Sequence, residues 1–162
     1  MKKYLLLLLV VLLVISGCSK EVKTEDNKTL FTCTKKGVKE SSKVTDDTYT
    51  KDIKYQAKLD DDGKLLHYTT DFIYYYESVD RCNYYCDLKT EWTNDINKKN
   101  YSGFKRIVNC NCSKEKKVQE TSEYDINNLD SFLRDDIQKM NSDNTFRLDE
   151  WLEKYEKADY NC

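Results

Sequence analysis

The sequence has no proline, four glycines and a single histidine among its 162 residues. It contains no glycine-rich loop that could cradle a phosphate or a dinucleotide, and no G-x-S-x-G nucleophile elbow. These absences exclude the common nucleotide-binding motifs and the nucleophile of the α/β-hydrolases. AT-rich codon usage also produces chains that are poor in proline and glycine and rich in tyrosine, so the thirteen tyrosines are not by themselves evidence of a function.

A large excess of charge of one sign is also missing. The chain has 27 basic and 29 acidic side chains, and the two signs are interspersed. Nucleic-acid-binding domains need a basic stripe or patch, so no nucleic-acid partner is expected. The apolar and aromatic residues are numerous enough to predict a folded domain instead of a disordered tail.

The N-terminus carries an uninterrupted apolar run, Tyr4 to Ile15, directly after Lys2 and Lys3. A confident membrane span needs about 20 apolar residues, and this run is shorter. A basic start followed by a short apolar segment is typical of a secretory signal peptide. We therefore expect residues 1–17 to be a signal peptide that is removed on export.

The residues Ile15-Ser16-Gly17-Cys18 have the pattern of a bacterial lipobox. The Cys18 thiol can accept diacylglycerol before cleavage makes it the new N-terminus. The alternative is an ordinary signal peptide followed by an unmodified cysteine, but the usual A-x-A-like site is absent. Two acyl chains hold a protein on a membrane without a transmembrane helix. The sequence therefore predicts a diacylglyceryl anchor at Cys18, with the membrane as partner, on the extracytoplasmic face of the cell membrane.

The mature chain divides into a short tether and one domain. Residues 18–28 are polar, charged and without periodicity, which predicts a tether. Residues 29–162 have the length of a single domain with its own core. We therefore expect one extracytoplasmic domain without internal repeats.

Alternating apolar and polar side chains predict antiparallel strands in the first half of this domain. A short β-prone run is Leu30 to Thr34. A polar loop is expected after it, and the clearest alternation then runs from Tyr49 to Leu59. The Asp-Gly at positions 62 and 63 predicts a hairpin turn. A return strand is then expected at 64–76, with its even positions facing the core.

Helical and extended patterns continue to the C-terminus. Helical spacing begins with Ser78 as N-cap and covers 78–97. A strand is expected at 104–112 with 117–124 as its hairpin partner, and helical spacing returns at 129–140 and 148–155. The order β-β-β-α-β-β-α-α lacks the alternation of a parallel sheet. It predicts an α+β domain, with a mostly antiparallel sheet and helices packed on one face.

Six cysteines remain once Cys18 is set aside, and an even number in an exported domain predicts disulfides. Cys82 and Cys86 lie one turn apart on a helix face, whereas Cys110 and Cys112 share a strand face. The connection is short, so helix and strand should run antiparallel and the helix start should meet the strand end. The expected disulfides are therefore Cys82–Cys112, Cys86–Cys110 and, by elimination, Cys33–Cys162.

Metal binding is the sharpest alternative for the four inner thiols. Thiolates of Cys82, Cys86, Cys110 and Cys112 on facing elements could hold zinc tetrahedrally. Their C-x3-C and C-x-C spacing does not fit a common zinc site, and export disfavours reduced thiols. The leading interpretation therefore includes no metal or other cofactor.

Candidates for catalysis are few. His67 lies with Thr69 and Asp71 on the solvent side of its predicted strand, which leaves an anchored enzyme with an unrecognised site as an alternative. A solvent-facing strand histidine without a catalytic role is the more common arrangement. The runs Tyr74-Tyr75-Tyr76 and Tyr84-Tyr85 could offer an aromatic platform to a sugar or a protein, or could fill the core.

Several features of the layout occur together. They are the lipobox, the tether, an early strand with Thr32-Cys33-Thr34, a lysine-rich hairpin and a C-terminal helix that ends in Asn161-Cys162. In this layout the chain resembles the small YehR-like lipoproteins of bacteria, a group without an established activity. The resemblance implies an anchored domain and no site residue beyond Cys18. We expect a non-enzymatic binding domain for an extracytoplasmic protein or glycan.

Overall fold

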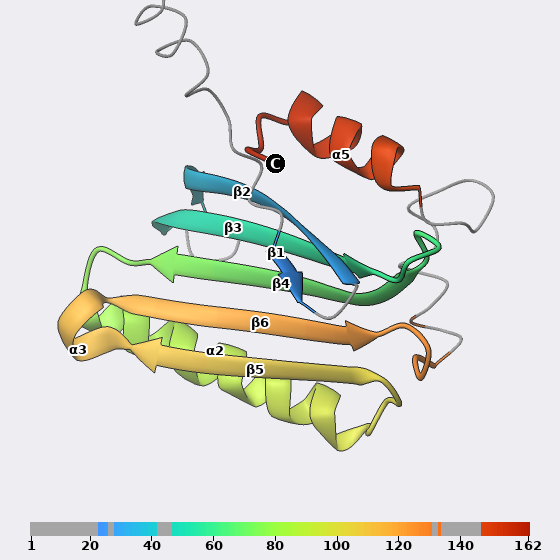
Figure 1. The fold of residues 1–162 in the computed structure, drawn as a ribbon. Helices are drawn as coiled ribbons and strands as arrows, with labels where there is room; N and C mark the ends of the chain where they lie inside the picture. The colour runs from blue at the N-terminus through green and yellow to red at the C-terminus, as the bar shows by residue number, and fades with distance from the viewer. Residues whose placement is uncertain (1–22, 26–27, 42–46, 131–132, 134–146) are drawn as a thin grey trace, which may run out of the picture.

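The computed structural model describes residues 23–25, 28–41, 47–130, 133 and 147–162. Their centre is a sheet of six antiparallel strands in the order β1-β2-β3-β4-β6-β5 (Figure 1). The strands are β1 (Lys23–Glu25), β2 (Lys28–Ser41), β3 (Thr48–Leu59), β4 (Leu65–Tyr75), β5 (Phe104–Asn111) and β6 (Lys117–Asp125). The helices are α2 (Val79–Lys98), α3 (Cys112–Glu115) and α5 (Leu148–Lys157). The expected α+β class and mostly antiparallel sheet are confirmed.

The order of elements differs from the expected one in two places. The short strand β1 pairs with β2, within the segment that was expected to be a tether. Between β5 and β6 lies the extra helix α3, and Cys112 is its first residue instead of the last residue of a strand. The helix expected at 129–140 lies mostly outside the described residues.

The hairpin between β3 and β4 is held by the chemistry of its turn. The Asp60 carboxylate accepts hydrogen bonds from the backbone N–H groups of Asp62 and Lys64, at 3.1 and 2.8 Å. Gly63 adopts a φ of 79°, which glycine reaches without steric cost. The Asp-Gly signal in the sequence therefore predicts this turn correctly.

One face of the sheet packs against both long helices. On the β2–β3 side, Trp151 and Tyr155 of α5 lie against Tyr55 and Tyr68, with ring centroids 4.6 to 6.5 Å apart. At the other end, buried side chains of α2 join a second cluster. Its buried members are Tyr76, Cys82, Tyr85, Cys112 and Val118. Figure 1 shows α5 near β2 and β3, and α2 along β6 and β5.

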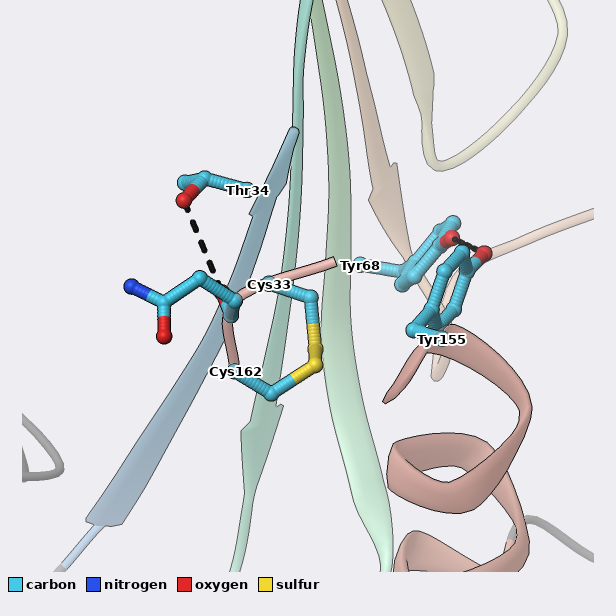
Figure 2. The surroundings of a disulfide bond; sticks show 6 residues. Cys33, Thr34, Tyr68, Tyr155 and Cys162 are labelled. Atoms are coloured by element: carbon cyan, nitrogen blue, oxygen red, sulfur yellow. Dashed lines mark hydrogen bonds between the residues drawn. A yellow bond between two sulfur atoms is a disulfide. The ribbon is translucent and has the colours of Figure 1, made fainter. Parts of the chain in front are cut away.

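The outer edge of β2 is covered by the C-terminus of the chain. The backbone N–H groups of Thr34 and Asn161 each donate to the other residue's carbonyl, both at 2.8 Å. Next to this pair, the disulfide Cys33–Cys162 joins Cα atoms that are 4.0 Å apart (Figure 2). Tyr68 and Tyr155 share a hydrogen bond of 3.2 Å nearby. The last residues therefore act as a short extra strand that is covalently attached.

The opposite edge of the sheet, β5, is capped by a helix side chain. The amide of Asn97 in α2 donates to the carbonyl of Arg106 at 2.8 Å and accepts from its N–H at 3.3 Å. Asn97 thus imitates the backbone of a neighbouring strand. Caps of this kind protect an edge against pairing with another chain.

Candidate functional site

The six cysteines of the domain form three disulfides in the structure. They are Cys33–Cys162, Cys82–Cys112 and Cys86–Cys110. The expected disulfide bonding is confirmed. Two of the pairs are those that the helix and strand spacing predicts, and Cys33–Cys162 is the pair expected by elimination. The bond Cys82–Cys112 is buried, whereas Cys110 is exposed.

The disulfides decide the role of the inner sulfurs. The four that were candidates for zinc are bonded in pairs, so none is a thiolate ligand. Among the described residues, no group of three or more histidine, cysteine and acidic side chains is arranged to hold a metal ion. With six of the seven cysteines paired, Cys18 has no cysteine of its own chain left to bond. Cys18 itself lies outside the described residues, within which no helix has the length and apolar character to cross a membrane.

The second face of the sheet carries polar side chains, and we call it the open face. It consists of the even positions 48–58 of β3, the odd positions 67–75 of β4 and their partners in neighbouring strands. Two central rows are Thr34-Lys54-Asp71-Thr121-Ile107 and Thr32-Gln56-Thr69-Glu123-Lys105. No helix in the described part of the chain packs on this face. It therefore presents a broad hydrogen-bonding surface.

A hollow of about 470 Å³ lies at one end of the open face, where β4, β6 and β5 are adjacent. The polar side chains at its border come from three strands: His67, Thr69, Lys105, Glu123 and Asp125. The Asn128 amide donates a hydrogen bond of 2.7 Å to the Asp125 carboxylate. This bond, helped by the nearby His67, holds the pKa of Asp125 below its usual value. The hollow thus combines donors with carboxylate acceptors, which suits a ligand rich in hydroxyl groups.

The hollow does not contain the geometry of a catalytic triad. Within the described residues, no hydrogen bond joins His67 to a hydroxyl group or to a carboxylate. Asp71 shares the face of His67, as the sequence predicts, but its carboxylate accepts from the side chains of Gln119 and Thr121, each at 2.9 Å. The described residues of the hollow therefore show no hydroxyl group that is activated by a neighbouring base.

The tyrosine runs are divided between the two faces of the sheet. Tyr76 and Tyr85 are buried and stack with ring centroids 4.8 Å apart, whereas Tyr75 is exposed on the open face. Tyr75 lies at a second hollow, of about 590 Å³, at the other end of β2, β3 and β4. In that hollow the Tyr49 hydroxyl donates to Glu40 at 3.0 Å, and burial together with this bond raises the pKa of Tyr49 to about 12. Most tyrosines of these runs therefore fill the core and do not form a platform.

A buried ion cluster connects α2 to the sheet on the helix side. The side chain of Glu120 is 6% exposed and pairs with Arg106 and with Lys89, whose Nζ lies 3.0 Å from Oε2. The same Nζ lies 3.9 Å from the centroid of the Tyr74 ring. This cluster has no access from the open face. Its role is structural.

The hollow at His67 depends on residues that the sequence pattern did not single out. Lys105, Glu123 and Asp125 are polar positions of β5 and β6, and only the pairing of β6 with β4 brings them to His67. The weak pattern of 117–124 predicted a strand there, but neither the face of its side chains nor its pairing with β4.

Comparisons with protein-family models, with curated proteins and with solved structures find no significant match to this chain. The assignment of function therefore rests on the residues and their geometry.

Proposed function

We propose that the chain is a lipid-anchored extracytoplasmic protein, similar to the YehR-like lipoproteins, whose domain binds a protein or glycan without catalysing a reaction. A signal peptide of residues 1–17 and a diacylglyceryl group on Cys18 belong to this proposal. So does a helix at 129–140, packed together with α5 on the face that contacts α2. The contacts of α5 with Tyr55 and Tyr68 support that packing.

The observation that carries the proposal is the pairing of all six cysteines that follow Cys18. Three disulfides indicate an oxidising environment, because cytosolic proteins keep their thiols reduced. An odd cysteine in such a protein needs another partner. The lipobox Ile15-Ser16-Gly17-Cys18 provides one, since the Cys18 thiol would be alkylated by diacylglycerol.

The anchor is tested in a bacterial host by metabolic labelling with a clickable palmitate analogue. The wild-type chain should carry the label and sediment with membranes, whereas Cys18→Ser should be unlabelled. Ser16→Ala is the matched control, because it keeps a small residue in the lipobox and should remain labelled. A wild-type chain that matures without label would refute the anchor.

The binding part of the proposal places the ligand at the hollow beside His67. Affinity capture from native membranes with the anchored protein should retain a specific protein or glycan. Glu123→Gln together with Lys105→Ala should weaken capture, because both side chains border the hollow. Lys98→Ala, on the exposed end of α2, should leave capture unchanged. Equal capture by all three proteins would remove the hollow from the proposal.

An anchored enzyme is the second candidate, favoured by one observation. His67 borders a hollow that also contains two carboxylates, Glu123 and Asp125. Such groups could act as acid and base in a hydrolysis. Turnover of a glycan or ester by the wild-type protein, abolished in His67→Ala, would favour this candidate over simple binding.

A further inference from the structure

We propose that the β2–β3 part of the open face rests on the anionic phospholipid surface of the membrane. The contact is made by Lys39, Lys54 and Lys58, which we call the lysine patch. This inference rests on the lipid anchor of the proposed function, because the anchor brings the domain to the bilayer.

The three lysines share one face by register. Lys39 is the partner of Thr50, Lys54 of Thr34 and Lys58 of Leu30. Thr34 and Thr50 belong to the open face, so the lysine side chains are directed to the same side of the sheet. Within the described residues, none of the three has an ion-pair partner. The patch extends over roughly 25 Å along the two strands, at about 3.3 Å per residue.

The acids near the patch are already engaged. The Asp52 carboxylate accepts from the Gly37 N–H at 2.8 Å and from the Tyr75 hydroxyl at 3.3 Å. Asp71, the partner of Lys54, accepts from two side chains of β6. The three aspartates 60–62 lie beyond Lys58, in the turn. The donors to Asp52 and Asp71 are neutral, so both carboxylates keep their charge. On β2 and β3 the open face still carries three lysines against one acid, Asp52, and this part of the surface is therefore basic.

The opposite side of the same strands carries a net negative charge. Helix α5 covers β2 and β3 there, and its sequence LDEWLEKYEK contains four acids and two lysines. One of these lysines, Lys157, pairs with Glu153 at 2.6 Å. An anionic surface repels this side and attracts the lysine patch. The charge distribution therefore selects which side of the domain faces the membrane.

The length of chain between the anchor and the sheet keeps the patch near the bilayer. Four residues, 19–22, separate Cys18 from Lys23, the first residue of β1. Five Cα steps span at most about 18 Å. Because β1 pairs with β2, this short connection ends at the edge of the sheet next to the patch. The anchored domain thus has the lysines within reach of the lipid headgroups.

The twist of the sheet keeps the hollow at His67 accessible in this orientation. Adjacent strands are rotated by about 20°, and four steps in the strand order separate β2 from β5. The two ends of the open face are therefore turned by roughly 80° relative to one another. When β2 and β3 rest on the bilayer, β6 and β5 are directed away from it.

The experiment measures lysine protection in the full mature lipoprotein, purified with its anchor and reconstituted into vesicles. One set of vesicles is phosphatidylcholine alone, and the other contains about a third phosphatidylglycerol. An amine-acetylating reagent is applied briefly, and mass spectrometry measures the rate at each lysine. Each lysine near an anionic membrane surface raises the affinity for that surface by a factor of about five. We expect the lysine patch to react at least fivefold more slowly on anionic vesicles, and the protection to vanish in 0.5 M salt.

The variants separate this inference from general electrostatics. Lys39→Glu with Lys58→Glu should abolish the protection of Lys54, the remaining reporter. Lys154→Glu with Lys157→Glu, on α5, should leave that protection intact. Circular dichroism identical to that of the wild type checks that both variants fold.

The outcomes distinguish failure of the anchor from failure of the inference. A protein that does not stay on neutral vesicles refutes the anchor. A protein that stays on both kinds of vesicle, with equal acetylation of the patch, refutes the contact with lipid. Protection that needs added polyphosphate and is absent on anionic vesicles would assign the patch to a wall polymer and also overturn the inference.

Discussion

Removal of the two disulfides that join α2 to the end of β5 and the start of α3 tests how the domain is stabilised. Cys82–Cys112 and Cys86–Cys110 close nested loops, with sequence separations of 30 and 24 residues. Closing either loop alone lowers the conformational entropy of the unfolded chain and thereby stabilises the fold by about 3.5 kcal/mol. Once one bond is present, the second closes a ring of only six residues, the difference between the two separations. That second closure is worth about 2 kcal/mol.

These magnitudes predict costs that do not add. Cys86→Ala with Cys110→Ala should lower the free energy of unfolding by about 2 kcal/mol. Cys82→Ala with Cys112→Ala should cost about 3.5 kcal/mol, because Cys82 is fully buried and its loss also leaves a cavity. Removal of all four cysteines should cost about 7 kcal/mol, which exceeds the sum of the separate losses by about 1.5 kcal/mol.

The assay is urea unfolding followed by the fluorescence of Trp151, a residue of α5 that is buried against the sheet. Sucrose in all samples keeps the least stable variant folded. The dependence on urea should steepen as bonds are removed, because the unfolded chain exposes more surface. Strictly additive losses, or a larger loss from the exposed pair Cys86–Cys110 than from the buried pair, would refute the nested-loop reasoning.

Three further predictions follow from the core, a tight turn and the tyrosines. Glu120→Gln should lower the free energy of unfolding by about 3 kcal/mol, since it leaves the largely buried cations of Lys89 and Arg106 unpaired. Lys89→Met should cost less, because Arg106 still pairs with Glu120. Thermal unfolding that ranks the two variants the other way would contradict this. Gly103→Ala should lower the free energy of unfolding, measured in urea, by more than about 2 kcal/mol. Gly103 has a φ of 68°, and an added Cβ would lie 2.6 Å from the Leu129 nitrogen. In the control Gly63→Ala the Cβ would meet no atom within 4 Å, so the loss should be smaller. Burial raises the pKa of Tyr68, and it raises that of Tyr49 to about 12. The stability that these neutral phenols contribute is therefore complete below about pH 10, and it is lost as the pH rises through their pKa values in the folded protein. Absorbance at 295 nm should therefore show these tyrosines ionising only with unfolding, and full ionisation in the folded protein near pH 10 would contradict it.

Local sequence patterns were sufficient to predict the elements whose structure depends on residues close together in the chain. The alternation of 49–59 and the Asp-Gly turn predicted the β3–β4 hairpin, because both depend on contacts a few residues apart. The N-cap of α2 is the predicted one: the Ser78 hydroxyl accepts from the Arg81 N–H at 3.2 Å. The disulfides followed from the same local logic, since a turn of helix and a strand repeat direct two sulfurs to one side.

The elements that the sequence did not predict depend on tertiary pairing. The second half of β2 was expected to be a loop, because a bulge between Lys35 and Val38 breaks its alternation. Gly37 allows this bulge with a φ of 68°, and its N–H is held by Asp52 of the next strand. A single-strand pattern contains no information on that partner.

The position of β6 between β4 and β5 could not be predicted from the sequence either, because it also depends on tertiary pairing. The sequence predicted β5 and β6 as a hairpin, and this pairing is correct. Nothing in the pattern of 117–124 indicates that its other edge pairs with β4. The hollow at His67 is built by that pairing. The candidate site could therefore be predicted only as a face with His67, Thr69 and Asp71, without Glu123 and Asp125.

The positions of the disulfides explain why the open face is the part of this fold that is available for binding. Cys33 lies on β2 and Cys110 on β5, the long strands toward the two ends of the sheet. Each bond attaches a segment that covers the outer side of its strand, the C-terminus at β2 and α2 at β5. A domain of this size buries limited apolar surface, so covalent bonds at the edges replace part of the packing that a second layer would supply. Because the sheet is held from its edges and from the helix side, its stability does not require a cover on the open face within the described residues. A polar face that folding leaves uncovered in the described part of the chain is the surface on which the binding and the membrane contact proposed above are to be tested first.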